Sequence, residues 1–150
     1  MRLIILLSVI ISALLLSCKA SQSLTAPVVA NTDSSAVPLV GHKWYLVKIH
    51  SAPAELNPLE KKAFIKFNTE KGSAGGNGSC NTFGSTLTVA GDKLTVKDLF
   101  STKMFCEGVQ GTEDAFFKQL GKVTRFEIVG TKLFLYAHSE ILLELKSESI

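Results

Sequence analysis

Two pairs of short alternating segments constrain the fold of this chain more than any other feature. Residues 86–89 and 93–96 flank Ala90-Gly91-Asp92, and residues 126–129 and 132–136 flank Gly130-Thr131. Apolar and polar side chains alternate in these segments, as they do in half-buried strands, and each connection is short enough for a hairpin. The pattern predicts two hairpins and mostly antiparallel pairing.

Three further segments are predicted strands because they are dense in aromatic, β-branched or aliphatic residues: 41–49, 63–67 and 141–145. Residues 112–121 do not show the two-residue alternation of a strand and predict a short amphipathic helix instead. Thr112 is its expected cap and Gly121 its expected stop. Its apolar face consists of Phe116, Phe117 and Leu120. We expect this face to pack on the sheet as core rather than to form a binding groove.

Residues 1–17 have the pattern of a secretory signal peptide. A helix formed by the aliphatic run from Leu3 to Leu16 reaches only about 21 Å, short of the roughly 30 Å hydrocarbon core of a bilayer. The tetrapeptide Leu15-Leu16-Ser17-Cys18 resembles the bacterial lipobox, in which the cysteine carries a diacylglycerol and the signal is cut just before it. We therefore predict lipidation of Cys18, which makes the membrane a partner; the alternative is an ordinary cleaved signal with an incidental thiol.

Residues 18–40 predict a flexible tether that follows the lipidated cysteine, since they are rich in Ser, Ala and Thr. A flexible segment of this length has an end-to-end distance of roughly 25 Å. Lys19 is not the aspartate that retains lipoproteins in the inner membrane of some enteric bacteria. We expect a location in the cell envelope, at the outer membrane and facing the periplasm, with one folded domain over residues 41–147.

Charge and motifs argue against nucleic-acid binding and against catalysis. Sixteen Lys and Arg residues stand against thirteen Asp and Glu, with no basic run. Glycine-rich residues 71–81 lack the Gly-Lys-Ser/Thr end of a phosphate loop, so these glycines are expected to serve positive φ angles, a bulge or close strand approach. The three histidines are isolated, and Glu113-Asp114 suits the positive end of a helix. We expect no enzyme, no catalytic residues, no metal and no cofactor.

Cys80 and Cys106 remain once Cys18 is assigned to the lipid. The secretory signal directs them to a compartment that permits disulfides. Closing a loop of about 27 residues would stabilise the domain by roughly 3–4 kcal/mol. A thiol-redox enzyme is the alternative, although neither Cys-x-x-Cys spacing nor a cation at a helix start accompanies these residues. The structural disulfide is the favoured interpretation.

Several landmarks together resemble the META domain, the family of HslJ-like heat-shock lipoproteins. They are Trp44, the block Gly78-Ser79-Cys80-Asn81-Thr82-Phe83, the block Ser101-Thr102-Lys103-Met104-Phe105-Cys106, and residues 113–120. The resemblance covers residues 41–146, with Ser79 at a position where family members often carry a different small residue. It implies a compact, mostly antiparallel β domain with one helix, and it implies no known catalysis. The expected fold is α+β, with a curved, barrel-like sheet and one short amphipathic helix.

Asn81, Thr102 and Met104 match recurrent positions of the family motif. One interpretation is a functional surface near the two cysteines; the other is structural, with Asn81 and Thr102 satisfying backbone groups and Met104 filling the core. The functional hypothesis is a non-catalytic, stress-related interaction module of the envelope, with another envelope protein or a cell-wall component as its partner. The alternative is a binder of a small hydrophobic or antibiotic-like molecule in a pocket of the β domain.

Overall fold

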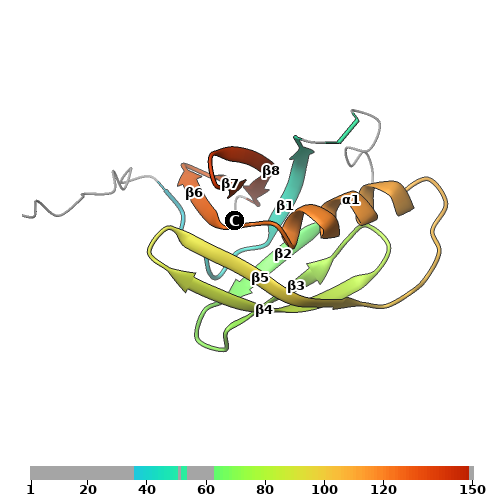
Figure 1. The fold of residues 1–150 in the computed structure, drawn as a ribbon, viewed down its shortest axis with the longest axis horizontal. Helices are drawn as coiled ribbons and strands as arrows, with labels where there is room; N and C mark the ends of the chain where they lie inside the picture. The colour runs from blue at the N-terminus through green and yellow to red at the C-terminus, as the bar shows by residue number, and fades with distance from the viewer. Residues whose placement is uncertain (1–35, 51, 54–62, 149–150) are drawn as a thin grey trace, which may run out of the picture. The chain divides into compact units, whose positions relative to one another are not determined.

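The computed structural model describes residues 36–50, 52–53 and 63–148. The predictions for the leader, for Cys18 and for the first part of the tether lie outside these residues. The strands are β1 (Trp44–Ile49), β2 (Phe64–Asn68), β3 (Ser73–Asn77), β4 (Thr82–Ala90), β5 (Lys93–Ser101), β6 (Arg125–Val129), β7 (Lys132–Ala137) and β8 (Glu140–Ser147), and the helix is α1 (Gln110–Leu120). Figure 1 shows this arrangement.

The strands form a closed ring in chain order, and each pairs antiparallel with the next until β8 returns to β1. The two predicted hairpins are β4–β5 and β6–β7, with Val89 opposite Leu94 and Ile128 opposite Leu133. The predicted α+β fold, mostly antiparallel with a curved sheet and one short helix, is confirmed. The pairing between neighbouring strands is shortest between β5 and β6, where Lys93 opposite Arg125 is the single paired position.

The inner face of the ring and the buried face of α1 together form the hydrophobic core. Its fully buried members include Trp44, Ile49, Ile65, Leu94, Phe116, Leu120, Leu133, Leu135, Leu143 and Leu145. The Trp44 indole N–H donates to the Leu39 carbonyl oxygen at 2.8 Å, and the Val37 N–H donates to the Gly130 oxygen at 3.1 Å. Contacts of the domain therefore extend to the amino-terminal side of Gly41.

The glycine-rich stretch forms β3, a strand that the sequence pattern did not predict. A Cβ atom added at Gly75 would lie 2.7 Å from the Phe83 carbonyl oxygen, and one at Gly76 would fall closer still to the Phe64 carbonyl oxygen. These glycines therefore let β3 lie tightly between β2 and β4. Close strand approach, one of the roles expected for them, is the role that they have at these two positions.

Helix α1 lies next to β1 and β8, and its Phe116 ring contacts Phe83 at the start of β4 (Figure 1). Phe116 and Leu120 are fully buried, and the Phe83 ring meets those of Phe116 and Phe117 edge to face. The expectation that Thr112 caps the helix is wrong, because the Glu113 N–H already bonds the Val109 carbonyl oxygen and places Thr112 inside the first turn. Across the described ranges, no helix is both long and apolar enough to cross a membrane.

Candidate functional site

A buried glutamate on α1 binds the turn that precedes β4. The Glu113 side chain is only 2% exposed. Its Oε2 atom accepts hydrogen bonds from the backbone N–H groups of Cys80 and Asn81 at 3.1 and 2.6 Å, and its Oε1 atom accepts one from the side-chain Nδ2 of Asn81 at 2.6 Å. A Cβ atom at Gly78 would lie 2.7 Å from Glu113 Oε2, so that position favours glycine. Three donors thus compensate for the burial of this carboxylate.

The Asn81 side chain connects this turn to the segment after β5. Its Oδ1 atom accepts the Thr102 hydroxyl at 2.8 Å and the Met104 N–H at 2.7 Å. Its Nδ2 atom donates to the Met104 carbonyl oxygen at 3.0 Å, in addition to Glu113. An asparagine amide has two donors and two acceptor positions, and all four are used here. We call Asn81, Thr102, Glu113 and the Met104 backbone the Asn81–Glu113 network.

The disulfide Cys80–Cys106 ties the same two segments covalently, with a Cα–Cα distance of 5.9 Å. The loop of residues 102–106, hereafter the 102–106 loop, is consequently held at Thr102, at Met104 and at Cys106. Two large apolar side chains of this loop face solvent, Met104 at 58% and Phe105 at 82% exposure. The network therefore fixes the backbone of a loop whose apolar side chains are displayed.

The structure brings together five of the residues singled out in the sequence: Cys80, Asn81, Thr102, Met104 and Cys106. Asn81 and Thr102 do satisfy polar groups, whereas the expectation that Met104 fills the core is wrong, since its backbone is used and its side chain is exposed. Cys18 lies outside the described residues.

The sequence pattern predicts only that Glu113 suits the positive end of the helix, and it misses the central role of Glu113 as the acceptor in this network. A usable signal was present: Glu113 lies three and seven residues before Phe116 and Leu120, on the buried stripe of α1. A carboxylate on an apolar stripe requires hydrogen-bond donors from elsewhere in the chain. The adjacent backbone of Cys80 and Asn81 supplies them.

A hollow of about 330 Å³ lies beside the network. Its lining includes Met104, Phe105 and Phe117 with the polar side chains of Lys103 and Asp114. The donors and acceptors of Asn81 are engaged and the two cysteines are bonded, so these groups hold the backbone in position. The described portion of the chain holds no group of three or more His, Cys, Asp or Glu side chains that could bind a metal ion.

A second polar cluster, between β6 and β7, is less buried. The Tyr136 hydroxyl donates to Glu127 Oε2 at 2.9 Å, and the Arg125 guanidinium lies 3.7 Å from the centre of the Tyr136 ring. Burial raises the pKa of Tyr136 above its ordinary value of 10.0, and the hydrogen bond and negative charge of Glu127 raise it further. Arg125 opposes this shift of the pKa. The phenol is consequently kept neutral in the folded protein.

Known proteins share this architecture. The family model described as META domain matches residues 37–149. No curated protein matches the chain significantly. A solved NMR structure of a protein from Burkholderia xenovorans has 20% sequence identity and a TM-score of 0.60, over 75% of this chain and 85% of that one. A second NMR structure has 23% identity and a TM-score of 0.53, over 70% of this chain and 87% of that one. These two similarities concern the fold alone.

Proposed function

Because the chain belongs to the META domain family, and because membership of this family implies no known catalysis, we propose that the chain is a non-catalytic interaction module of the cell envelope. In this proposal the domain is lipid-anchored through Cys18 and binds another envelope protein. The binding surface is the 102–106 loop with the adjacent hollow. The observation that carries the proposal is the pair of exposed side chains, Met104 and Phe105, on a backbone that the Asn81–Glu113 network holds in place.

The chemistry of the loop supports a protein partner. Scattered apolar residues are ordinary on protein surfaces, but here two large ones are adjacent and border a hollow. Methionine and phenylalanine are enriched in the cores of protein interfaces. A loop that is already fixed loses little conformational entropy when a partner binds, so more of the contact energy appears as affinity.

The envelope location in this proposal rests on the sequence. Leu15-Leu16-Ser17-Cys18 resembles a lipobox, and the tether would hold the domain roughly 25 Å from the bilayer. More than one acyl chain on Cys18 gives stable anchoring that a single chain cannot give. We place the protein at the outer membrane, facing the periplasm, and we link it to heat stress through the family resemblance.

Crosslinking of the full-length lipoprotein in its own membrane, before and after heat stress, tests this function. Captured proteins are identified by mass spectrometry. We expect a reproducible partner that is lost in the double variant Met104→Ser/Phe105→Ser and in Cys18→Ala. The matched control is Val47→Ser/Val129→Ser, which removes apolar side chains of 46% and 49% exposure from other surfaces. Capture of the same partner by the loop variant would overturn the assignment of the surface.

A small hydrophobic ligand is the second candidate function. The hollow of about 330 Å³ beside Met104, Phe105 and Phe117 falls at the lower end of the volumes of ligand pockets, about 300–1,000 Å³. This pocket lies beside the loop and not within the ring, where the buried core side chains are found. Binding of a small hydrophobic dye that Met104→Ser/Phe105→Ser abolishes, together with no captured protein in either state, would favour this function over the first.

A further inference from the structure

A row of four outward-facing positions crosses the sheet from β2 to β5. Lys66 is paired with Gly75, Gly75 with Gly84, and Gly84 with Phe100. Lys66 and Phe100 are exposed, whereas Phe67, Ala74 and Phe83, each next to one of these positions along its strand, are buried inside the ring. Three steps between neighbouring strands span about 15 Å. The row therefore has a cation at one end, an aromatic ring at the other and a floor of two glycines between them.

Packing explains the two glycines of this floor. At Gly75 a Cβ atom would lie 2.7 Å from the Phe83 carbonyl oxygen, and at Gly84 it would lie 2.6 Å from the tip of the Phe100 ring. The Phe100 ring consequently reaches over Gly84 on the outer face. Its side chain is nevertheless 70% exposed. Gly75 thus leaves the backbone open to a ligand, next to an aromatic ring that covers Gly84 and is itself open to solvent.

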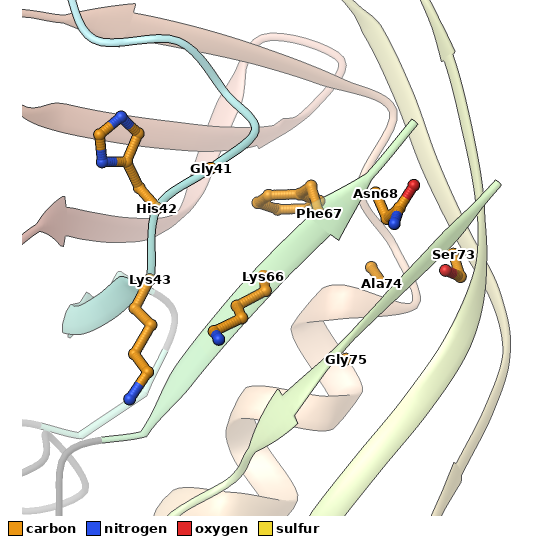
Figure 2. Close-up of a pocket in the computed structure, with 9 residues that line it drawn as sticks. All are labelled: Gly41, His42, Lys43, Lys66, Phe67, Asn68, Ser73, Ala74 and Gly75. Carbon is orange, nitrogen blue, oxygen red and sulfur yellow. The ribbon is translucent and has the colours of Figure 1, made fainter. Parts of the chain in front are cut away.

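Two lysines mark the other end of the row. Lys43 places its Nζ atom 4.9 Å from the centre of the Phe64 ring, and Lys66 follows Phe64 by two residues on the same face of β2. Figure 2 shows the side chains of Lys43 and Lys66 beside a hollow of about 450 Å³. Residues 41–43 line one side of this hollow, and residues 66–68 of β2 and 73–75 of β3 line the other. Neither lysine forms an ion pair within residues 36–50, 52–53 and 63–148. Their charges are available to an anionic ligand.

Small polar side chains flank the row on both sides. Asn68, Ser73 and Thr86 are in register on one side, and Asn77 and Thr82 on the other. These side chains both donate and accept hydrogen bonds. A face of this kind offers many short polar contacts but little apolar area for a protein partner.

From these observations we propose that the outer face of β2 to β5 binds an anionic polysaccharide. The carboxylates of the polysaccharide pair with Lys43 and Lys66, its hydroxyl groups bond the flanking amides and hydroxyls, and one sugar ring lies over Gly75, against the Phe100 ring that covers Gly84. Sheet faces bind oligosaccharides in other all-β folds. The two lysines complement the negative charge of such a chain, and the proposal does not depend on the 102–106 loop.

The test is calorimetric titration of the full-length protein in nanodiscs with a galacturonic acid oligomer, and with neutral maltohexaose of the same ring type. We expect binding of the anionic oligomer, weakened by salt, and little or none of the neutral one. Lys43→Gln and Lys66→Gln should each lower the affinity about tenfold, as the loss of a charge-assisted hydrogen bond would. Lys118→Gln, at an exposed lysine of α1, is the matched control and should bind as the original does.

Two further variants test the aromatic ring and its position. Phe100→Ser removes the aromatic surface, and Gly84→Ala displaces the flexible Phe100 ring, whose tip would lie 2.6 Å from the added Cβ atom. Both should weaken binding, while Met104→Ser/Phe105→Ser should leave it unchanged, so failure here is distinguishable from failure of the proposed protein contact. Equal binding of the neutral oligomer, no binding of the anionic one, or indifference to both lysine variants would overturn the proposal.

Discussion

Two glutamates of this domain each accept a hydrogen bond from a side chain, but their surroundings differ. Glu113 is buried and also accepts two backbone N–H groups, whereas Glu127 is exposed and accepts the hydroxyl of Tyr136. An exposed acceptor that loses its partner can be hydrated, but a buried backbone donor that loses its acceptor cannot. The comparison indicates that the Asn81–Glu113 network fixes a loop, while the Tyr136 cluster only adjusts stability.

The largest effect should come from removing the buried acceptor. Glu113→Ala leaves the N–H groups of Cys80 and Asn81 without their acceptor, so we expect a loss of about 3–5 kcal/mol in the free energy of unfolding. Chemical denaturation followed by the fluorescence of Trp44, the only tryptophan, measures this loss. Asp114→Ala, at the neighbouring exposed position, is the control and should cost no more than about 0.5 kcal/mol. Similar losses in both variants would contradict the comparison.

The disulfide should rank next. Replacing both cysteines, Cys80→Ser/Cys106→Ser, should lower the free energy of unfolding by about 3–4 kcal/mol, because the unfolded chain regains the freedom of the closed loop. The network should still hold the loop in the folded state. Amide exchange at Met104, whose N–H donates to Asn81, reports on this directly. Exchange as fast as in an unfolded peptide would show that the hydrogen bonds alone cannot hold the loop.

The smallest effect belongs to the exposed glutamate. Tyr136→Phe removes one hydrogen bond and should cost about 1 kcal/mol at neutral pH. Because the pKa of Tyr136 is raised in the folded state, its contribution is complete below pH 10 and is lost as the pH rises through the folded value. The original protein should therefore lose stability above pH 10 more steeply than the variant. Chemical denaturation at several pH values measures this difference. The control is Tyr45→Phe, because the Tyr45 hydroxyl donates to Glu148 at an exposed position.

Much of the fold could be predicted because local signals and tertiary structure agree. The turns at Gly91 and Gly130 and the alternating segments around them specify both hairpins. Strand β3 could not be predicted, since the residues Ser73–Asn77 include no strong strand former and the strand exists only because its neighbours approach it. The start of α1 was missed because Thr112 resembled a cap while the helix had already begun.

The candidate site was predictable in part. The two cysteine blocks indicated that Asn81, Thr102 and Met104 belong together, and the structure places them in one network. The link to Glu113 depends on how α1 packs against the turn before β4, which no local pattern encodes. The exposure of Phe105 was also unforeseen, because hydrophobic residue types predict burial unless their backbone is held at the surface.

The position of the disulfide also bears on chain cleavage. Cys80 precedes β4 and Cys106 follows β5, so the whole β4–β5 hairpin lies between the two bonded residues. The turn at Gly91 is the exposed tip of this hairpin, where a protease would most readily cut. A single cut there leaves two fragments that remain covalently joined. A nicked molecule therefore keeps α1 and the closing strands attached to the part of the chain that carries Cys18.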